Sequence, residues 1–188
     1  LDIYRKINFD FNYPVFEVDT SKIRLYSIAD SVETTEDYMI EKDTLSGRSW
    51  FLARDWVSKM KYRLLAEPGA FMDMYENIND TLIVNFSIQD EEHYGVLHVK
   101  TSNVKCPLIV QLMDDKEAVQ KEKYIASDEV ITYNWLNPGR YKIKYIYDTN
   151  ENRKWDTGKY LEGIQPEKVE YYEGDIVIRS NWEMEINW

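Results

Sequence analysis

The segment from Asp148 to Asp156 holds the side chains best suited to chemistry in this 188-residue sequence. Oxygen-bearing side chains stand at alternate positions along it, at Asp148, Asn150, Asn152 and Asp156. Hard oxygen donors at this spacing can converge on one Ca²⁺, with the Lys154 carbonyl as a fifth ligand. The spacing therefore predicts a calcium site in this segment.

A second interpretation of the same segment needs no metal. Asp and Asn side chains commonly accept hydrogen bonds from backbone N–H groups two residues on, which forms Asx-turns. The sequence also departs from the EF-hand pattern, because Arg153 takes the glycine position and Lys159 takes that of the last glutamate. The calcium site and the series of Asx-turns both remain open from the sequence.

Aromatic residues supply a second candidate site. The chain has 6 Trp, 15 Tyr and 6 Phe. Exposed, coplanar rings on a sheet would stack on sugar faces, and the candidates for such a platform are Trp50, Trp56, Trp135 and Trp155. Core packing is the competing interpretation, because aromatic residues favour strands. Trp182 and Trp188 alternate in phase with Met184 and Ile186, which predicts that both lie in a core.

Catalytic constellations are not evident in the sequence. It lacks the H-E-x-x-H, C-x-x-C and G-x-S-x-G motifs. His93 and His98 are five residues apart in a strand-like run and should point to opposite faces. The lone Cys106 is best explained as a small buried hydrophobe. We therefore expect no catalytic residues, and no cofactor other than a structural Ca²⁺.

Alternation of apolar and polar residues is the main structural signal. It is clear at 82–88, 141–147 and 182–188, and shorter runs of the same kind occupy 22–28, 37–42, 48–54, 60–66, 94–100, 107–113 and 118–125. Such runs predict half-buried strands, and their spacing predicts sandwiches or barrels. For 113–123 we expect a turn and then an exposed edge strand, and for 67–77 a loop with one helical turn.

Turn residues agree with an all-β chain. Leu45-Ser46-Gly47 can close a hairpin between 37–42 and 48–54. Asn137-Pro138-Gly139 has the residues of a type II turn. Tyr141 follows two residues later, and this spacing resembles the tyrosine corner of Greek-key sandwiches, whose hydroxyl bonds back to the preceding loop.

Charge and hydropathy exclude some classes of function. With 23 basic and 34 acidic residues the formal net charge is −11, which disfavours nucleic-acid binding. No run approaches the ~20 apolar residues of a membrane-spanning helix. A charged break at Asp90-Glu91-Glu92 divides the chain into 1–89 and 90–188, each the size of one Ig-like sandwich. A single larger sandwich is the rival arrangement.

Residues 1–89 resemble bacterial Ig-like domains of the SbsA type. The resemblance lies in Asn8-Phe9-Asp10, Tyr13-Pro14-Val15, the run 19–23, Pro68-Gly69-Ala70-Phe71 and Asn79-Asp80-Thr81. Residues 90–188 resemble the C-terminal module of surface lipoproteins of anaerobic Gram-negative bacteria. That resemblance lies in Leu136–Tyr141, Asp148–Gly158, Gln165–Glu167 and Asn181–Glu183.

The two resemblances imply an all-β chain of two consecutive Ig-like and transthyretin-like (carboxypeptidase-regulatory-like) β-sandwich domains. They also imply a non-catalytic structural or interaction module of an exported cell-surface protein. Because the chain begins with Leu1, we expect an upstream segment that carries a lipid anchor. Expected partners are upstream domains of the same polypeptide, and a surface protein or glycan. The alternatives are a carbohydrate-binding module and an accessory or inhibitory domain of a hydrolase.

Overall fold

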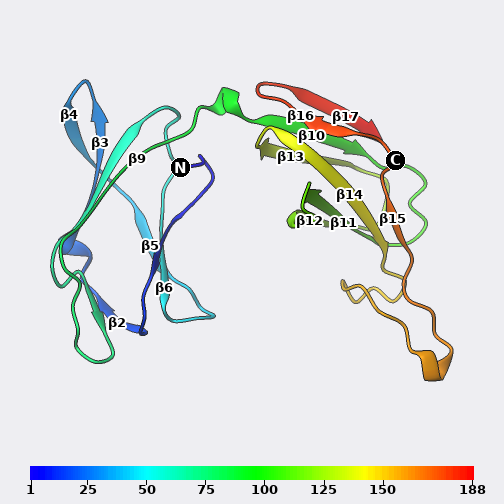
Figure 1. The fold of residues 1–188 in the computed structure, drawn as a ribbon, viewed down its shortest axis with the longest axis horizontal. Helices are drawn as coiled ribbons and strands as arrows, with labels where there is room; N and C mark the ends of the chain where they lie inside the picture. Colours follow the sequence, from blue (N-terminus) through cyan, green and yellow to red (C-terminus); the bar gives the residue numbers. More distant parts are fainter. The chain divides into compact units, whose positions relative to one another are not determined.

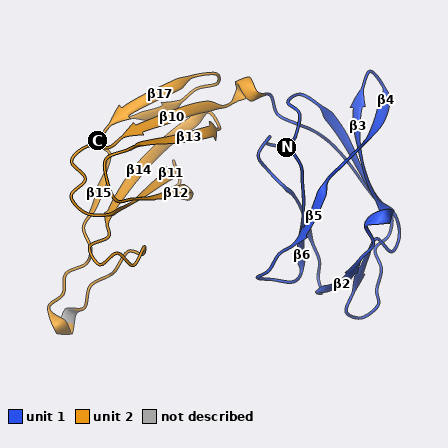
Figure 2. Ribbon diagram, turned by 180° about the vertical axis from the view of Figure 1, so that it is seen from behind, with its two compact units in different colours: residues 1–90 blue, residues 91–188 orange. Residues whose placement is uncertain are grey.

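A computed structural model describes residues 1–188, with the exception of the Tyr160 side chain, and the chain is all-β. The predicted fold class is thereby confirmed. The chain divides into unit 1, Leu1–Asp90, and unit 2, Glu91–Trp188 (Figure 2). The helical segments in the described part are short 3₁₀ turns, η1 (Thr20–Lys22), η2 (Glu91–His93) and η3 (Tyr160–Glu162). No helix of the described residues has the length and apolar character to cross a bilayer.

Unit 1 is built from nine strands in small antiparallel sheets (Figure 1). One sheet has the order β1-β6-β5 and a second has the order β4-β3-β7-β9, while β2 pairs with β8. The strands are β1 (Ile7–Asp10), β2 (Val15–Val18), β3 (Ile23–Ala29), β4 (Val32–Glu36), β5 (Met39–Lys42), β6 (Ser49–Ala53), β7 (Lys61–Ala66), β8 (Phe71–Asp73) and β9 (Leu82–Ser87).

The core of unit 1 follows from alternation in its strands. Ile23 and Leu25 of β3 and Leu64 of β7 are buried, while their neighbours along each strand are more exposed. The other sheet contributes Phe9 and Leu52 to the same cluster. The unit therefore encloses one apolar interior between its sheets, as a sandwich requires.

Unit 2 has eight strands in two sheets. One sheet has the order β13-β10-β17, and the other has the order β12-β11-β14-β15 with β16 also paired to β14. The strands are β10 (Gly95–Lys100), β11 (Leu108–Asp114), β12 (Val119–Ile125), β13 (Val130–Leu136), β14 (Gly139–Tyr147), β15 (Val169–Tyr171), β16 (Ile176–Ile178) and β17 (Glu183–Asn187). The pairing of β10 with β17 is parallel, whereas the other named pairs are antiparallel.

The core of unit 2 joins both of its sheets in one cluster. Leu97 and Val99 of β10 pack with Leu112 of β11 and Ile143 of β14. Gly95 starts β10 where no side chain fits, because a Cβ there would lie 2.5 Å from Ile178 Cγ2 and 2.7 Å from the Arg179 carbonyl. The close approach of the 178–182 segment to β10 therefore requires glycine at this position.

The strands expected from alternation are all present, and so is the 45–47 hairpin turn, whereas β1, β2, β4 and β13 were not expected. Residues 113–123 form a turn followed by the edge strand β12, as predicted. The helical turn predicted within 67–77 is wrong. This segment instead forms strand β8, which pairs with β2 and whose Phe71 N–H bonds to the Asn79 side chain at 2.8 Å.

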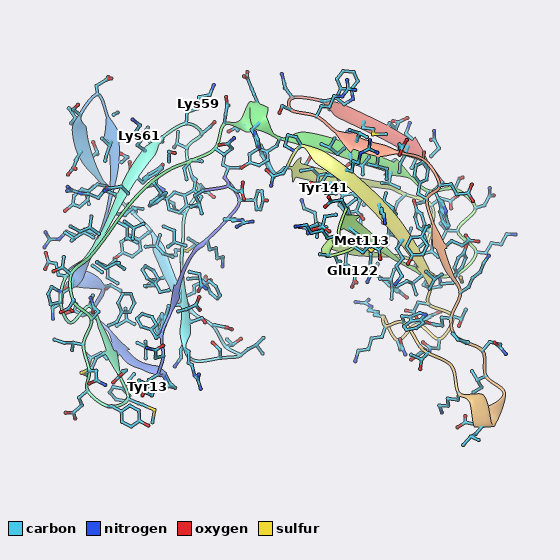
Figure 3. All side chains as sticks on the ribbon, viewed as in Figure 1. Tyr13, Lys59, Lys61, Met113, Glu122 and Tyr141 are labelled. Carbon is cyan, nitrogen blue, oxygen red and sulfur yellow. The ribbon has the colours of Figure 1, made fainter. Side chains whose placement is uncertain are left out.

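The turn at 137–139 also differs in part from the prediction. The tyrosine corner is present, because the Tyr141 hydroxyl donates to the Asn137 carbonyl at 2.8 Å. Tyr141 itself is labelled in Figure 3, near the start of β14. The type II turn is wrong, because Gly139 is not among the glycines with positive φ and instead begins β14. The left-handed residue in this region is Trp135, with φ +60°.

Candidate functional site

The loop between β14 and β15 is organised by a buried carboxylate. Asp148 is fully buried directly after β14, and its N–H donates to the Pro107 carbonyl at 3.0 Å. One carboxylate oxygen accepts the Asn152 N–H at 3.1 Å, and the other accepts the Arg153 N–H at 2.7 Å. A buried carboxylate needs hydrogen-bond donors around it, and here backbone N–H groups of the loop supply them. Asp148 therefore fixes the start of the loop to residues 152 and 153.

The next two candidate ligands form successive Asx-turns. Asn150 Oδ1 accepts the Asn152 N–H at 3.1 Å, and Asn152 Oδ1 accepts the Lys154 N–H at 2.8 Å. Both side-chain amides donate to Asp156 Oδ2, that of Asn152 at 2.8 Å. The four predicted ligands are thus neighbours. Asn150 and Asn152 form Asx-turns, whereas Asp148 and Asp156 accept other hydrogen bonds within the loop.

Glu167 is a further member of this loop, and ligand spacing alone does not indicate it. Its side chain is buried; one oxygen accepts the Thr149 N–H at 2.8 Å and the other accepts the Asp156 N–H at 3.1 Å. The Glu167 backbone bonds to Asp156 and, through its carbonyl, to the Trp155 indole N–H at 3.2 Å. This carboxylate closes the base of the loop from a position 11 residues beyond Asp156.

The loop backbone resembles an EF-hand loop more closely than its residue types do. Arg153 adopts φ +61° at the position where an EF-hand has glycine. Lys159 bonds to Ile164 and Glu162 instead of standing in for the last glutamate. Among the described residues, no three acidic, His or Cys side chains converge as a metal-binding group. The calcium site stays a prediction.

The four tryptophans proposed as a sugar platform are divided between the two units. Trp56 is 7% exposed in the core of unit 1, where its ring meets Tyr62 edge-on and its N–H donates to the Arg5 carbonyl. Its assignment to a binding surface is therefore wrong. Trp50 is half-buried against the same core. Only Trp135 and Trp155 expose substantial ring area, and both belong to unit 2.

Trp182 is also placed differently from the prediction. Its side chain is 54% exposed, so the assignment of Trp182 to the core is wrong, whereas Trp188 does pack against the core of unit 2. The difference arises because β17 begins only at Glu183. Trp182 precedes the strand, next to Asn181 at φ +51°, so strand alternation does not set the direction of its side chain.

Trp135 and Trp182 line one depression of about 550 Å³ on unit 2. The amides Asn134 and Asn181 lie in the same lining. Trp135 is held edge-on against Tyr94, with ring centroids 5.7 Å apart, and the Arg179 guanidinium carbon lies 6.0 Å from the centre of the Trp182 ring. We refer to this feature as the Trp135–Trp182 depression.

A β-bulge directs Trp135 into this depression. Gly95 pairs with Leu136 and Leu97 pairs with Tyr133, so β13 has one more residue than β10 across this interval. Trp135 takes the left-handed conformation in the bulge, which is a strained choice for a bulky side chain. Bulges commonly change the direction of a side chain next to a functional site.

Several ionisable groups of unit 2 with shifted pKa values lie in its core or in ion pairs on its strands. Burial raises the pKa of Tyr133 and of Tyr145, whose rings lie in the core. Burial and the Glu170 carboxylate raise the pKa of Tyr147 to about 12. Hydrogen bonds from Lys168 and Tyr147 lower the pKa of Glu170. These shifts therefore describe packing and ion pairing in the sandwich.

Comparison with known proteins adds little to these observations. No protein-family model and no curated protein matches the chain. One solved structure found as a neighbour is BcpA, the major pilin subunit of Bacillus cereus, at 13% identity and a TM-score of 0.29. The alignment covers 98% of this chain and 59% of the pilin chain, so this chain spans about three fifths of the pilin's length. Likeness at this level carries no argument, and the fold assignment rests on the sheets themselves.

Proposed function

We propose that this chain is a non-catalytic structural and interaction module of an exported cell-surface protein, in which unit 2 bears tension. The observation that supports a mechanical role is the parallel pairing of β10 with β17, the first and last strands of unit 2. The surface location rests on the family resemblance of the sequence.

Parallel pairing places the two ends of unit 2 at opposite ends of the same ladder. The register runs from Val96 opposite Glu183 to Lys100 opposite Asn187. Hydrogen bonds extend the pairing at both ends, from Val96 N–H to the Trp182 carbonyl at 2.9 Å and from Trp188 N–H to the Lys100 carbonyl at 2.8 Å. A pull on both chain ends would slide the strands past each other and load all these bonds together.

The two chain ends of unit 1 lie side by side, unlike those of unit 2. The Leu1 amino group donates to the Ser87 carbonyl at 2.7 Å, and the Gln89 N–H donates to the Leu1 carbonyl at 2.9 Å. The first residue of unit 1 therefore lies beside the segment by which the chain leaves it. Tension between these two points would open the bonds one after another, so we expect unit 1 to yield at lower force than unit 2.

Single-molecule pulling tests the proposal, because forced unfolding reports the unfolding rate under load. In a Cys106→Ser background of the full chain, one variant carries handles at Glu92→Cys and at a cysteine added after Trp188. The comparison variant carries them at Ser127→Cys and at the same added cysteine. Residue 127 adjoins Asp128, whose carboxylate caps Asn103 and Val104 near the Trp188 end, so this pair does not load the ladder in shear. We expect a higher unfolding force for the first pair, and equal forces would contradict the proposal that unit 2 bears tension.

A further inference from the structure

We propose that the Trp135–Trp182 depression binds a neutral glycan by stacking a pyranose ring on exposed indole. This inference goes beyond the mechanical role, because it assigns a ligand class to a site that tension would not use. The starting observation is that two tryptophans at 38% and 54% exposure line the same hollow of about 550 Å³. Small-molecule sites commonly have volumes of about 300–1,000 Å³.

Packing holds the exposed indole of Trp135 in place, although its backbone conformation is strained. The Tyr94 ring supports Trp135 from the interior, since Tyr94 itself is 4% exposed. Trp135 keeps this place despite its φ of +60°, where a glycine would sit without strain. Residues held in such conformations cluster at ligand-binding positions.

The polar groups around the indoles suit sugar hydroxyls. Asn134 and Asn181 carry both donors and acceptors, and the carboxylates of Glu91, Glu92 and Glu183 accept hydrogen bonds. Apolar ring faces flanked by such groups match a pyranose, which has an apolar C–H face and a rim of hydroxyls. The lining has three carboxylates against the one Arg179 guanidinium beside Trp182, and this excess of negative charge would repel sialylated or uronic-acid glycans, so we assign a neutral glycan.

The experiment uses the full chain on an array of neutral and acidic glycans, followed by affinity electrophoresis in gels that contain starch, mixed-linkage β-glucan, xylan or galactomannan. We expect binding to at least one neutral glycan. Trp182→Ala should weaken that binding about tenfold or more, because it removes an exposed stacking face. Tyr171→Ala is the matched control, since Tyr171 is an aromatic residue 53% exposed on β15, outside the depression, and should leave binding unchanged.

A second variant separates a lost ring from a misfolded sandwich. Trp135→Gly suits the left-handed backbone at this position, and the strain that it relieves offsets part of the packing lost against Tyr94, so the variant should still melt cooperatively while losing glycan binding. Three results would overturn the proposal: no neutral glycan bound, equal binding by the parent and Trp182→Ala, or binding only of a cationic probe such as tetramethylammonium. None of these results would bear on the pulling experiment, which probes β10 and β17.

Discussion

The indole of Trp188 lies flat on the phenol of Tyr145, with ring centroids 3.9 Å apart and planes inclined by 12°. Tyr145 belongs to β14 and is fully buried, while Trp188 directly follows β17 in the other sheet. The stack therefore joins the two sheets of unit 2 beside the parallel β10–β17 ladder. The Trp188 backbone is fixed as well, by bonds to Lys100 and Ser102.

Replacement of Trp188 by alanine should lower the free energy of unfolding by about 2–3 kcal/mol, because it removes a half-buried aromatic ring from the core. Chemical denaturation followed by circular dichroism measures the change. Trp182→Ala is the control, and its exposed ring should cost less than about 0.5 kcal/mol. Equal losses for the two variants would contradict the different burial of these tryptophans.

The tyrosine corner gives a second prediction. Tyr141→Phe removes only the hydroxyl that donates to the Asn137 carbonyl, so unfolding should become easier by about 1 kcal/mol. Tyr171→Phe is a suitable control, because Tyr171 is 53% exposed. Thermal melts of both variants provide the comparison. An unchanged melting temperature for Tyr141→Phe would show that this bond contributes nothing to stability.

Buried tyrosines make unit 2 sensitive to alkali. Burial raises the pKa of Tyr145 and Tyr133 above the usual value of about 10, so the unfolded chain releases these protons at lower pH than the folded chain. Their contribution to stability is complete below about pH 10 and is lost as the pH rises toward the folded pKa values. Urea denaturation between about pH 8 and pH 11 should therefore show falling stability at the alkaline end.

The variant Tyr145→Phe isolates this effect. It cannot ionise at residue 145, so its stability should fall less steeply with pH than that of the parent chain. At neutral pH it should be as stable as the parent or slightly more so, because the Tyr145 hydroxyl is buried without a hydrogen-bond partner among the described residues. Parallel pH profiles for parent and variant would rule out a contribution of Tyr145.

Alternation predicted most of the longer strands, but it missed the seven-residue β13, whose pattern is broken by the exposed apolar residues Val130 and Trp135. Short strands and side-chain direction at strand ends were not accessible either. β8, β15 and β16 have three residues each, too few to show a period of two. Trp182 and Trp188 have the same phase in the sequence and both lie just outside β17. Trp188 is held in the core by its stack on Tyr145, whereas Trp182 follows the left-handed Asn181 and is exposed. The bulge at Trp135 depends on pairing with β10, which no local pattern encodes.

The loop after β14 illustrates the same limit. Asp148, Asn150, Asn152 and Asp156 were recognisable because they are close in sequence and regularly spaced. Glu167 was not, because its role depends on the return of the chain to Thr149 and Asp156. A carboxylate that arrives from a distant segment has no fixed spacing from its partners, so only the folded loop identifies it.

The calcium prediction can now be tested with Glu167 included. If Ca²⁺ binds at 148–156, about millimolar Ca²⁺ should release or absorb heat in calorimetry and raise the melting temperature, since a ligand bound only by the folded state stabilises it. Asp156→Asn should abolish both effects, because it removes a charged ligand while keeping the shape of the side chain. Glu167→Gln should weaken them if this carboxylate supplies the ligand missing at Lys159.

Mg²⁺ at the same concentration is the control, because its strict octahedral geometry suits this loop poorly. Absence of both heat and stabilisation with Ca²⁺ would leave the Asx-turns and the Glu167 bonds as the full account of the loop.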